Sequence, residues 1–332
     1  MTAERRASID LLDRRVLFVT GKGGVGKTTV SCALALSAAR RGKRVLLVET
    51  GPKENLSFLF GTGPIGYEPV EVYPGVRALH LDPYEALTEF LTHEIRIRMI
   101  ARSFVRNRVF RYLAEVAPGW RELITLGKIW VEEGRLDPKT RSPRHDLVIV
   151  DAPATGHGIG LLRVPRVLLD TLSFGPIKHY TARVEDLLED PRRTAVVVVT
   201  LAEEMPVNET AELVATARET VRVPLGVVFA NGVYPEVFPR GTKGTAQAFI
   251  ADPDAVARLD RALGPGLDAG DVIRCARSLA ERYELNRRYL KLLAERVSLP
   301  ILVLPYLFTE QFDVRDLEEL SREVDRALED GQ

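Results

Sequence analysis

The sequence predicts an α/β protein with a mostly parallel sheet flanked by helices. Short runs of Val, Leu and Ile alternate with longer stretches of helical periodicity along the 332 residues. The apolar runs are nearly continuous, as strands buried on both faces require. A glycine-rich segment also follows the first run and precedes an Ala-rich helical stretch, which is a strand–loop–helix order typical of this fold class.

The order of these patterns predicts one domain over residues 1–332, with a helical subdomain inserted at 83–133, where no apolar strand interrupts the helical periodicity. Residues 232–271 carry several Gly and Pro and are expected to form a loop with one short helix. Residues 313–332 predict a helix with an acidic outer face. The expected strands are residues 16–20, 44–49, 76–81, 146–151, 195–200, 225–231 and 299–305.

Composition narrows the class of protein. Apolar residues make up 45% of the chain, and 46 Lys and Arg balance 46 Asp and Glu. A zero net charge gives no indication of nucleic acid or an anionic membrane as partner. The amino terminus is too charged for a signal peptide, and the apolar runs fall short of the ~18 residues that span a bilayer. With two cysteines far apart, we expect a soluble, cytoplasmic protein without an integral membrane segment.

A phosphate-binding loop is the strongest motif. Residues 21–28 match G-x-x-x-x-G-K-[ST] in full, and the backbone N–H groups of such a loop face phosphate oxygens at a helix N-terminus. Lys27 is expected to reach the β- and γ-phosphates, and the Thr28 hydroxyl to ligate Mg²⁺. The predicted cofactors are therefore ATP and Mg²⁺. The residues expected to contact the nucleotide here are Gly21, Gly23, Gly24, Val25, Gly26, Lys27, Thr28 and Thr29.

A second lysine, Lys22, directly follows the first glycine of the loop. The stretch GKGGVGKTT resembles the deviant Walker A signature of a class of dimeric P-loop ATPases. That resemblance implies that Lys22 reaches the partner's nucleotide and neutralises charge as an arginine finger does. Lys22 and Lys27 are thus candidate catalytic residues. The alternative is that Lys22 is simply a solvated side chain on a loop.

Further segments resemble the family of arsenical pump-driving ATPases and tail-anchored-protein targeting ATPases. An apolar strand ends at Asp151, the Walker B position, and APATGHG after it is similar to the family's switch II. This implies that Asp151 holds Mg²⁺, while Asn231 and Pro305 match positions on the adenine side of the site. The similar segments are LHLDPYEALTEFL (79–91), DPRRTAVVVVTLAEEMPVNET (190–210), LGVVFAN (225–231) and LPYLFTEQ (304–311).

The chain also departs from this family. Its switch I segment, VETGPKENLSFLFG, has Gly51 where the family has a water-orienting Asp. Glu49 and Glu54 stand nearby as replacements, and Glu49 alternatively holds Mg²⁺ through water. Loss of such a group costs ~10²–10⁴-fold in rate, so hydrolysis is expected to be slow or partner-dependent. Neither Cys32 nor Cys275 supports the metalloid or zinc sites known in the family.

Within the helical insertion, residues 94–116 combine an apolar stripe with arginines on another face. Three interpretations stay open. The helix packs on its own domain, it lines a groove for an apolar protein client, or its arginines face an anionic lipid or an acidic protein. The arginines are Arg98, Arg102 and Arg106.

Together these patterns predict a dimeric Mg–ATP-binding P-loop ATPase, an enzyme that couples ATP binding and hydrolysis to conformational change and to a protein client or partner. The alternative is a non-hydrolysing or slow regulatory subunit in a heterodimer with a related ATPase. A membrane-positioning or DNA-partition ATPase shares the two-lysine loop, but the acidic tail and the balanced charge disfavour both. A small-molecule synthetase needs polar substrate loops, which we do not identify.

Overall fold

The computed structural model describes residues 11–51, 55–95, 119–153, 157–171, 173–236, 252–263 and 266–330. In this part of the chain, eight strands form one sheet in the order β3-β4-β2-β5-β1-β6-β7-β8. The strands are β1 (Val16–Gly21), β2 (Val45–Glu49), β3 (Val70–Tyr73), β4 (Val76–His80), β5 (Leu147–Asp151), β6 (Thr194–Leu201), β7 (Leu225–Val233) and β8 (Ile301–Pro305).

The sheet is parallel except at one edge, where β3 pairs antiparallel with β4. The strand β1 lies between β5 and β6, and all three are buried along almost their full length. Because neighbouring parallel strands end at the same edge, Gly21, Glu49, Asp151 and Asn231 lie at the carboxyl edge of the sheet. This edge is where α/β sheets bind ligands.

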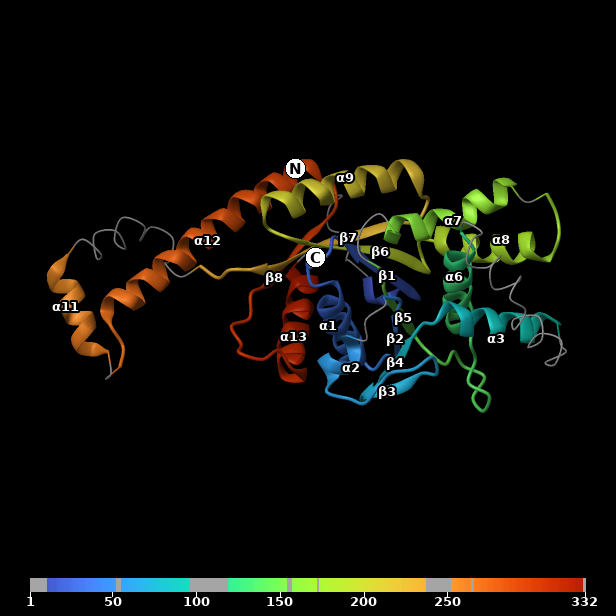
Figure 1. Cartoon of the computed structure of the whole chain (residues 1–332), viewed down its shortest axis with the longest axis horizontal. Coiled ribbons are helices and arrows are strands. Elements are labelled where there is room, and N and C mark those ends of the chain that lie inside the picture. The colour runs from blue at the N-terminus through green and yellow to red at the C-terminus, as the bar shows by residue number, and fades with distance from the viewer. Residues whose placement is uncertain are drawn as a thin grey trace.

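Helices cover both faces of the sheet (Figure 1). One face packs against α1, α2 and α13, and the other against α6, α7, α8, α9 and α12. The helices are α1 (Lys27–Arg40), α2 (Asn55–Phe60), α3 (Pro83–Ile95), α6 (Trp120–Glu133), α7 (His157–Thr171), α8 (Pro176–Glu189), α9 (Glu204–Thr220), α11 (Pro253–Ala262), α12 (Ala269–Arg296) and α13 (Val314–Asp330).

The predicted fold class and all seven expected strands are confirmed, with ends that differ by at most two residues. The sequence analysis missed β3. This strand is short and lies at the sheet edge, and its first two residues are exposed, so it lacks the continuous apolar run of a buried strand.

The predicted helical insertion at 83–133 is described in two pieces, α3 and α6. The amphipathic stretch at 94–116, with Arg98, Arg102 and Arg106, lies almost entirely outside the described residues. In the described part, α6 packs against α3, α7 and α8 and against β5. The inserted helices therefore lie beside helices that follow β5, and together they form one side of the molecule (Figure 1).

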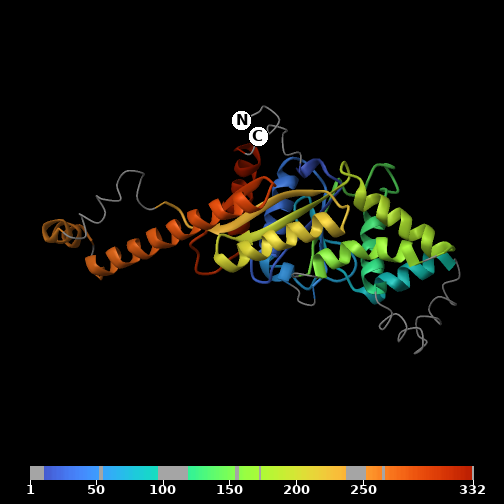
Figure 2. The ribbon, with the colours of Figure 1, turned by 90° about the horizontal axis from the view of Figure 1, so that it is seen from above.

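The helix α12 extends far beyond the sheet. Its 28 residues correspond to ~42 Å at ~1.5 Å per residue. Only its second half contributes buried apolar residues, Tyr289 and Leu293, to the core. Its first half projects from the body of the molecule with α11 packed at the far end (Figures 1 and 2). The expected loop at 232–271 therefore contains α11 and leads into this arm.

Candidate functional site

The phosphate-binding loop connects β1 to α1 at the carboxyl edge of the sheet. Its glycines are required by close contacts. Gly26 has φ 88°, and a Cβ there would lie 2.3 Å from Asn231 Nδ2. A Cβ on Gly21 would lie 2.2 Å from the carbonyl oxygen of Val199. The backbone contact of Gly21 and the left-handed φ of Gly26 both disfavour a side chain, so these two glycines allow the loop to lie directly against β6 and β7.

Lys27 is the first residue of α1, and its side chain folds back over the loop. Its Nζ donates a hydrogen bond to the carbonyl oxygen of Lys22 at 3.0 Å. Burial lowers the pKa of Lys27, and the negative charge of Asp151 opposes this decrease. The loop therefore carries an ammonium group at the helix N-terminus, where a phosphate is stabilised by both the charge and the backbone N–H groups.

Thr28 and Asp151 meet beside this lysine. Thr28 Oγ1 donates a hydrogen bond to Asp151 Oδ2 at 2.6 Å. Asp151, at the end of β5, is only 6% exposed. Its pKa is raised to about 6, chiefly by burial and further by the nearby Glu49, while the Thr28 hydrogen bond and Lys27 oppose the increase.

The residues fit a magnesium ion. Asp151 Oδ1 is buried and has no hydrogen-bond partner in the described part of the chain. A buried carboxylate oxygen without a partner is costly, and a cation bound there removes that cost. The Thr28 hydroxyl and the Asp151 carboxylate are the hard oxygen ligands that Mg²⁺ prefers, and a magnesium ion at a phosphate site takes its other ligands from phosphates and water.

Glu49 lies next to Asp151, because β2 and β5 pair in register at these residues. It is 1% exposed. One carboxylate oxygen accepts a hydrogen bond from the backbone N–H of Asn55 at 2.8 Å, and the other lies 3.4 Å from His80 Nδ1. Glu49 therefore anchors the start of α2 to the sheet. Glu54, the other predicted carboxylate, lies outside the described residues.

Lys22 is held by a partner in its own chain. Its Nζ lies 2.6 Å from Oε1 of Glu209, a residue of α9. Both side chains line a cavity of about 310 Å³ between α7 and α9, together with Arg163 and Glu212. Lys22 thus points toward α9, whereas Lys27 spans the loop. The sequence analysis did not anticipate Glu209, which is distant in sequence and belongs to a helix.

Asn231 and Pro305 lie at the ends of the neighbouring strands β7 and β8. Asn231 Nδ2 donates a hydrogen bond to the carbonyl oxygen of Val25 at 3.0 Å. This contact joins the carboxyl end of β7 to the phosphate loop. The structure therefore brings the predicted adenine-side asparagine to the predicted phosphate site.

An aromatic cluster beside these residues was missed by the sequence analysis. Tyr234 and Tyr306 stack with centroids 4.7 Å apart, and Phe308 lies 5.0 Å from Tyr306. The available signal was the Tyr-Leu-Phe run directly after the last strand. Such a run is equally consistent with core packing, and its exposure becomes known only from the fold.

Other parts of the described chain limit the chemistry. No cluster of three or more His, Cys, Asp or Glu side chains is arranged there to hold a metal ion. Cys32 is buried in α1, and Cys275 is exposed on α12. Among the described helices, none is both long enough and apolar enough to cross a membrane.

A glycine-rich loop between a buried strand and a helix, with a lysine, a hydroxyl and a carboxylate at one edge of a parallel sheet, defines a P-loop nucleotide-binding protein. The model of the "Anion-transporting ATPase" family matches residues 14–181. The chain belongs to this family, and it is an ATPase that binds ATP.

Relatives agree with this assignment. The chain is 30% identical to ATPase BagA of Mycobacterium tuberculosis over 93% of its own length and 92% of that protein. It is 31% identical to an arsenical pump-driving ATPase of Acidiphilium multivorum over 74% of this chain and 44% of that protein. It is 34% identical to ATPase get3 of Schizosaccharomyces japonicus over 48% of this chain and 49% of that protein.

Proposed function

We propose that the chain works as a dimer that couples ATP binding and hydrolysis to a change in its helical subdomain, residues 83–133. One observation carries this proposal. The phosphate loop has two lysines, and only Lys27 spans the loop. The side chain of Lys22 is 45% exposed and held by Glu209, so it is accessible to a second copy of the chain whose nucleotide lies opposite.

Each proposed role follows from the contacts of the site. Lys27 and the loop N–H groups hold the phosphates, because they present positive charge at one helix N-terminus. Thr28 and Asp151 hold Mg²⁺, which when bound neutralises charge on the β- and γ-phosphates. Asn231 and Pro305 contact the adenine from the ends of β7 and β8.

Apart from Asp151, the proposed magnesium ligand, no carboxylate in the described part of this site is free to orient the attacking water. Gly51 has no side chain for the task, and both oxygens of Glu49 have partners, Asn55 and His80. Glu49 acts as the base only if nucleotide binding releases one of them. If Glu49 stays bound to both partners, the site has no base of its own. That case favours the alternative function, a slow or non-hydrolysing subunit whose related partner supplies the missing carboxylate.

The helical subdomain is the proposed place for a protein client or partner, and the cytoplasm is the proposed location. Described helices of this subdomain pack on α7 and α8, which follow the switch II segment along the chain. A change at the γ-phosphate therefore has a direct packing route to them.

The first test measures ATP turnover and sedimentation of the purified chain with Mg²⁺. We expect turnover per chain to rise with chain concentration, because the complete site needs two copies. Lys22→Ala is expected to lower turnover by ~10³-fold, the effect of removing an arginine finger.

Lys291→Ala removes an exposed lysine of α12 that has no contact with the phosphate loop in the described part of the chain, and serves as the matched control. Turnover that is independent of chain concentration and equal in all three proteins would exclude the dimeric site. Tight ATP binding without turnover would select the regulatory subunit.

A further inference from the structure

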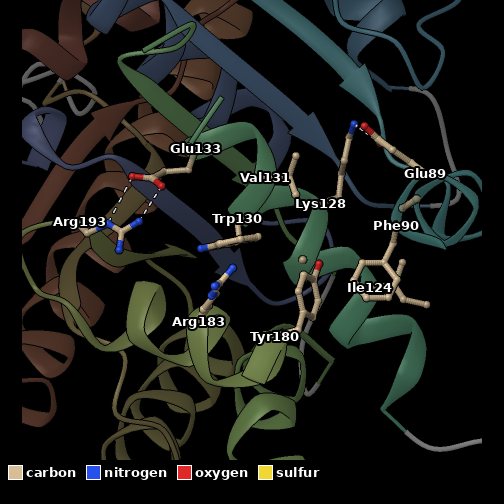
Figure 3. Close-up of a pocket in the computed structure, with 13 residues that line it drawn as sticks. Glu89, Phe90, Ile124, Lys128, Trp130, Val131, Glu133, Tyr180, Arg183 and Arg193 are labelled. Atoms are coloured by element: carbon tan, nitrogen blue, oxygen red, sulfur yellow. Dashed lines mark hydrogen bonds and ion pairs between the residues drawn. The ribbon is translucent and has the colours of Figure 1, made fainter. Parts of the chain in front are cut away.

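A second cavity lies away from the phosphate loop, between α3, α6 and α8. It has a volume of about 490 Å³, within the range of small-ligand sites. Its walls are mainly apolar and come from three helices: Phe90 from α3, Ile124, Trp130 and Val131 from α6, and Tyr180 from α8 (Figure 3). No residue of the phosphate loop lines it.

The aromatic wall of this cavity depends on one glycine. A Cβ on Gly127 would lie 1.7 Å from the hydroxyl oxygen of Tyr180, so α6 can accept this ring only where it has no side chain. Tyr180 then packs against Phe90 with centroids 4.6 Å apart, and edge-on against Trp130 at 5.7 Å. Mutual packing of the three rings holds the wall in place before a ligand arrives.

Among the described residues, two of the three cationic side chains that line the cavity form ion pairs with carboxylates. Lys128 lies 2.6 Å from Glu89 and 2.9 Å from Glu132. Arg193 lies 2.7 Å from Glu133. These cations are therefore paired, and so are the two carboxylates that line the cavity, Glu89 and Glu133 (Figure 3).

Arg183 differs from the paired cations. Its guanidinium carbon lies 5.8 Å from the centre of the Trp130 ring, and its Nη2 lies 3.3 Å from the ring nitrogen Nε2 of His179. It forms no ion pair with a carboxylate in the described part of the chain. An exposed guanidinium with free donors thus lies at an apolar cavity, where it favours a carboxylate ligand.

We propose that this cavity binds a small amphipathic carboxylate, with its apolar body against Phe90, Trp130 and Tyr180 and its carboxylate on Arg183. This proposal does not depend on the dimer or on the nucleotide site. The proposed ligand class is a medium-chain fatty carboxylate.

The test is titration calorimetry of the full chain with decanoate and with decanol, which share the apolar chain and differ in charge. We expect one saturable decanoate site per chain, with decanol binding ~10-fold more weakly, because a hydrogen bond to a charged group is lost. Equal affinities for the two ligands, or no saturable decanoate binding, would overturn the proposal.

Variants then assign the site. Arg183→Gln is expected to weaken decanoate ~10-fold and leave decanol unchanged, and Arg183→Lys to restore most of the loss. Gly127→Ala displaces Tyr180 and is expected to weaken both ligands, and circular dichroism checks that it folds. Arg192→Gln changes an exposed arginine outside the cavity and is the control. Unchanged decanoate affinity in Arg183→Gln would refute the role of this arginine even if Gly127→Ala does not fold.

Discussion

Gly51 lies two residues beyond the end of β2, at the carboxyl edge of the sheet, where the phosphate loop follows β1. A Cβ built on Gly51 meets no atom of the described residues within 4 Å, and its backbone is not in the left-handed region. A side chain is therefore tolerated there. We expect Gly51→Asp to raise the ATP turnover of the purified chain by ~10²-fold, at the lower end of the effect of a positioned acid–base group.

Gly63→Asp is the matched control. A Cβ on Gly63 also meets no atom of the described residues within 4 Å, and this substitution adds the same charge away from the end of β2. Steady-state turnover with Mg²⁺ at saturating ATP makes the comparison. If Gly51→Asp turns over ATP no faster than Gly63→Asp, the water is positioned by another group, with Glu49 the first candidate.

At the scale of single residues, the sequence predicted which side chains meet at the edge of the sheet. The loop motif and the strand-end positions place Lys27, Thr28, Asp151 and Asn231 together, because parallel strands end at one edge. Their partners were not predictable. Glu209 is brought to Lys22 by the packing of α9, and nothing in its local sequence indicates that contact.

At the scale of elements, the helix α8 carries a buried carboxyl group with a raised pKa. Glu185 is 8% exposed, and its pKa is raised to about 7 by burial and by Glu189, while Arg166 and Arg222 oppose the increase. Glu185 does not destabilise the fold at low pH, where its carboxyl is protonated in both the folded and the unfolded chain. As pH rises from about 4.5 through about 7, the unfolded chain ionises first, and the free energy of unfolding falls.

We therefore expect Glu185→Gln to raise the free energy of unfolding at pH 8 by about 1–3 kcal/mol relative to wild type, and to have little effect at pH 5. Urea unfolding followed by circular dichroism at both pH values measures this. Asp186→Asn, at an exposed neighbouring position, is the control. An equal effect of Glu185→Gln at the two pH values would contradict burial of a protonated carboxyl.

The elements that could be predicted from the sequence were those with a single clear hydrophobic pattern. The central strands are continuous apolar runs because helices cover both faces, and the seven expected from the sequence are present. The edge strand β3 has one exposed end and no such run. The sequence did not predict the arm of α12 either. The second half of this helix packs on the domain and the first half projects from the domain, and the local sequence does not indicate where that packing ends.

For the whole molecule, the proposed dimer requires Lys22 to leave Glu209 in each copy before it reaches the nucleotide of the other copy. Exposed ion pairs of this kind contribute about 0–1 kcal/mol. We expect Glu209→Gln to lower the concentration of a non-hydrolysable ATP analogue needed for half-maximal dimerisation by up to ~5-fold. Analytical ultracentrifugation gives the dimer fraction.

Glu212→Gln is the matched control, because Glu212 lines the same cavity and forms no ion pair with Lys22 in the described part of the chain. If Glu209→Gln requires more analogue than the wild type, Glu209 supports the closed dimer. The contact with Lys22 then does not hold the free chain open.

The sequence by itself determined the fold class, the phosphate loop and the family, because these depend on local patterns: apolar runs, glycine spacing and the residues at strand ends. Only the tertiary structure decided which distant groups meet. The pairing of Lys22 with Glu209, the enclosure of Glu49 by Asn55 and His80, and the cavity at Arg183 each join separate elements. Such contacts arise from packing between helices and sheet, which no single segment specifies.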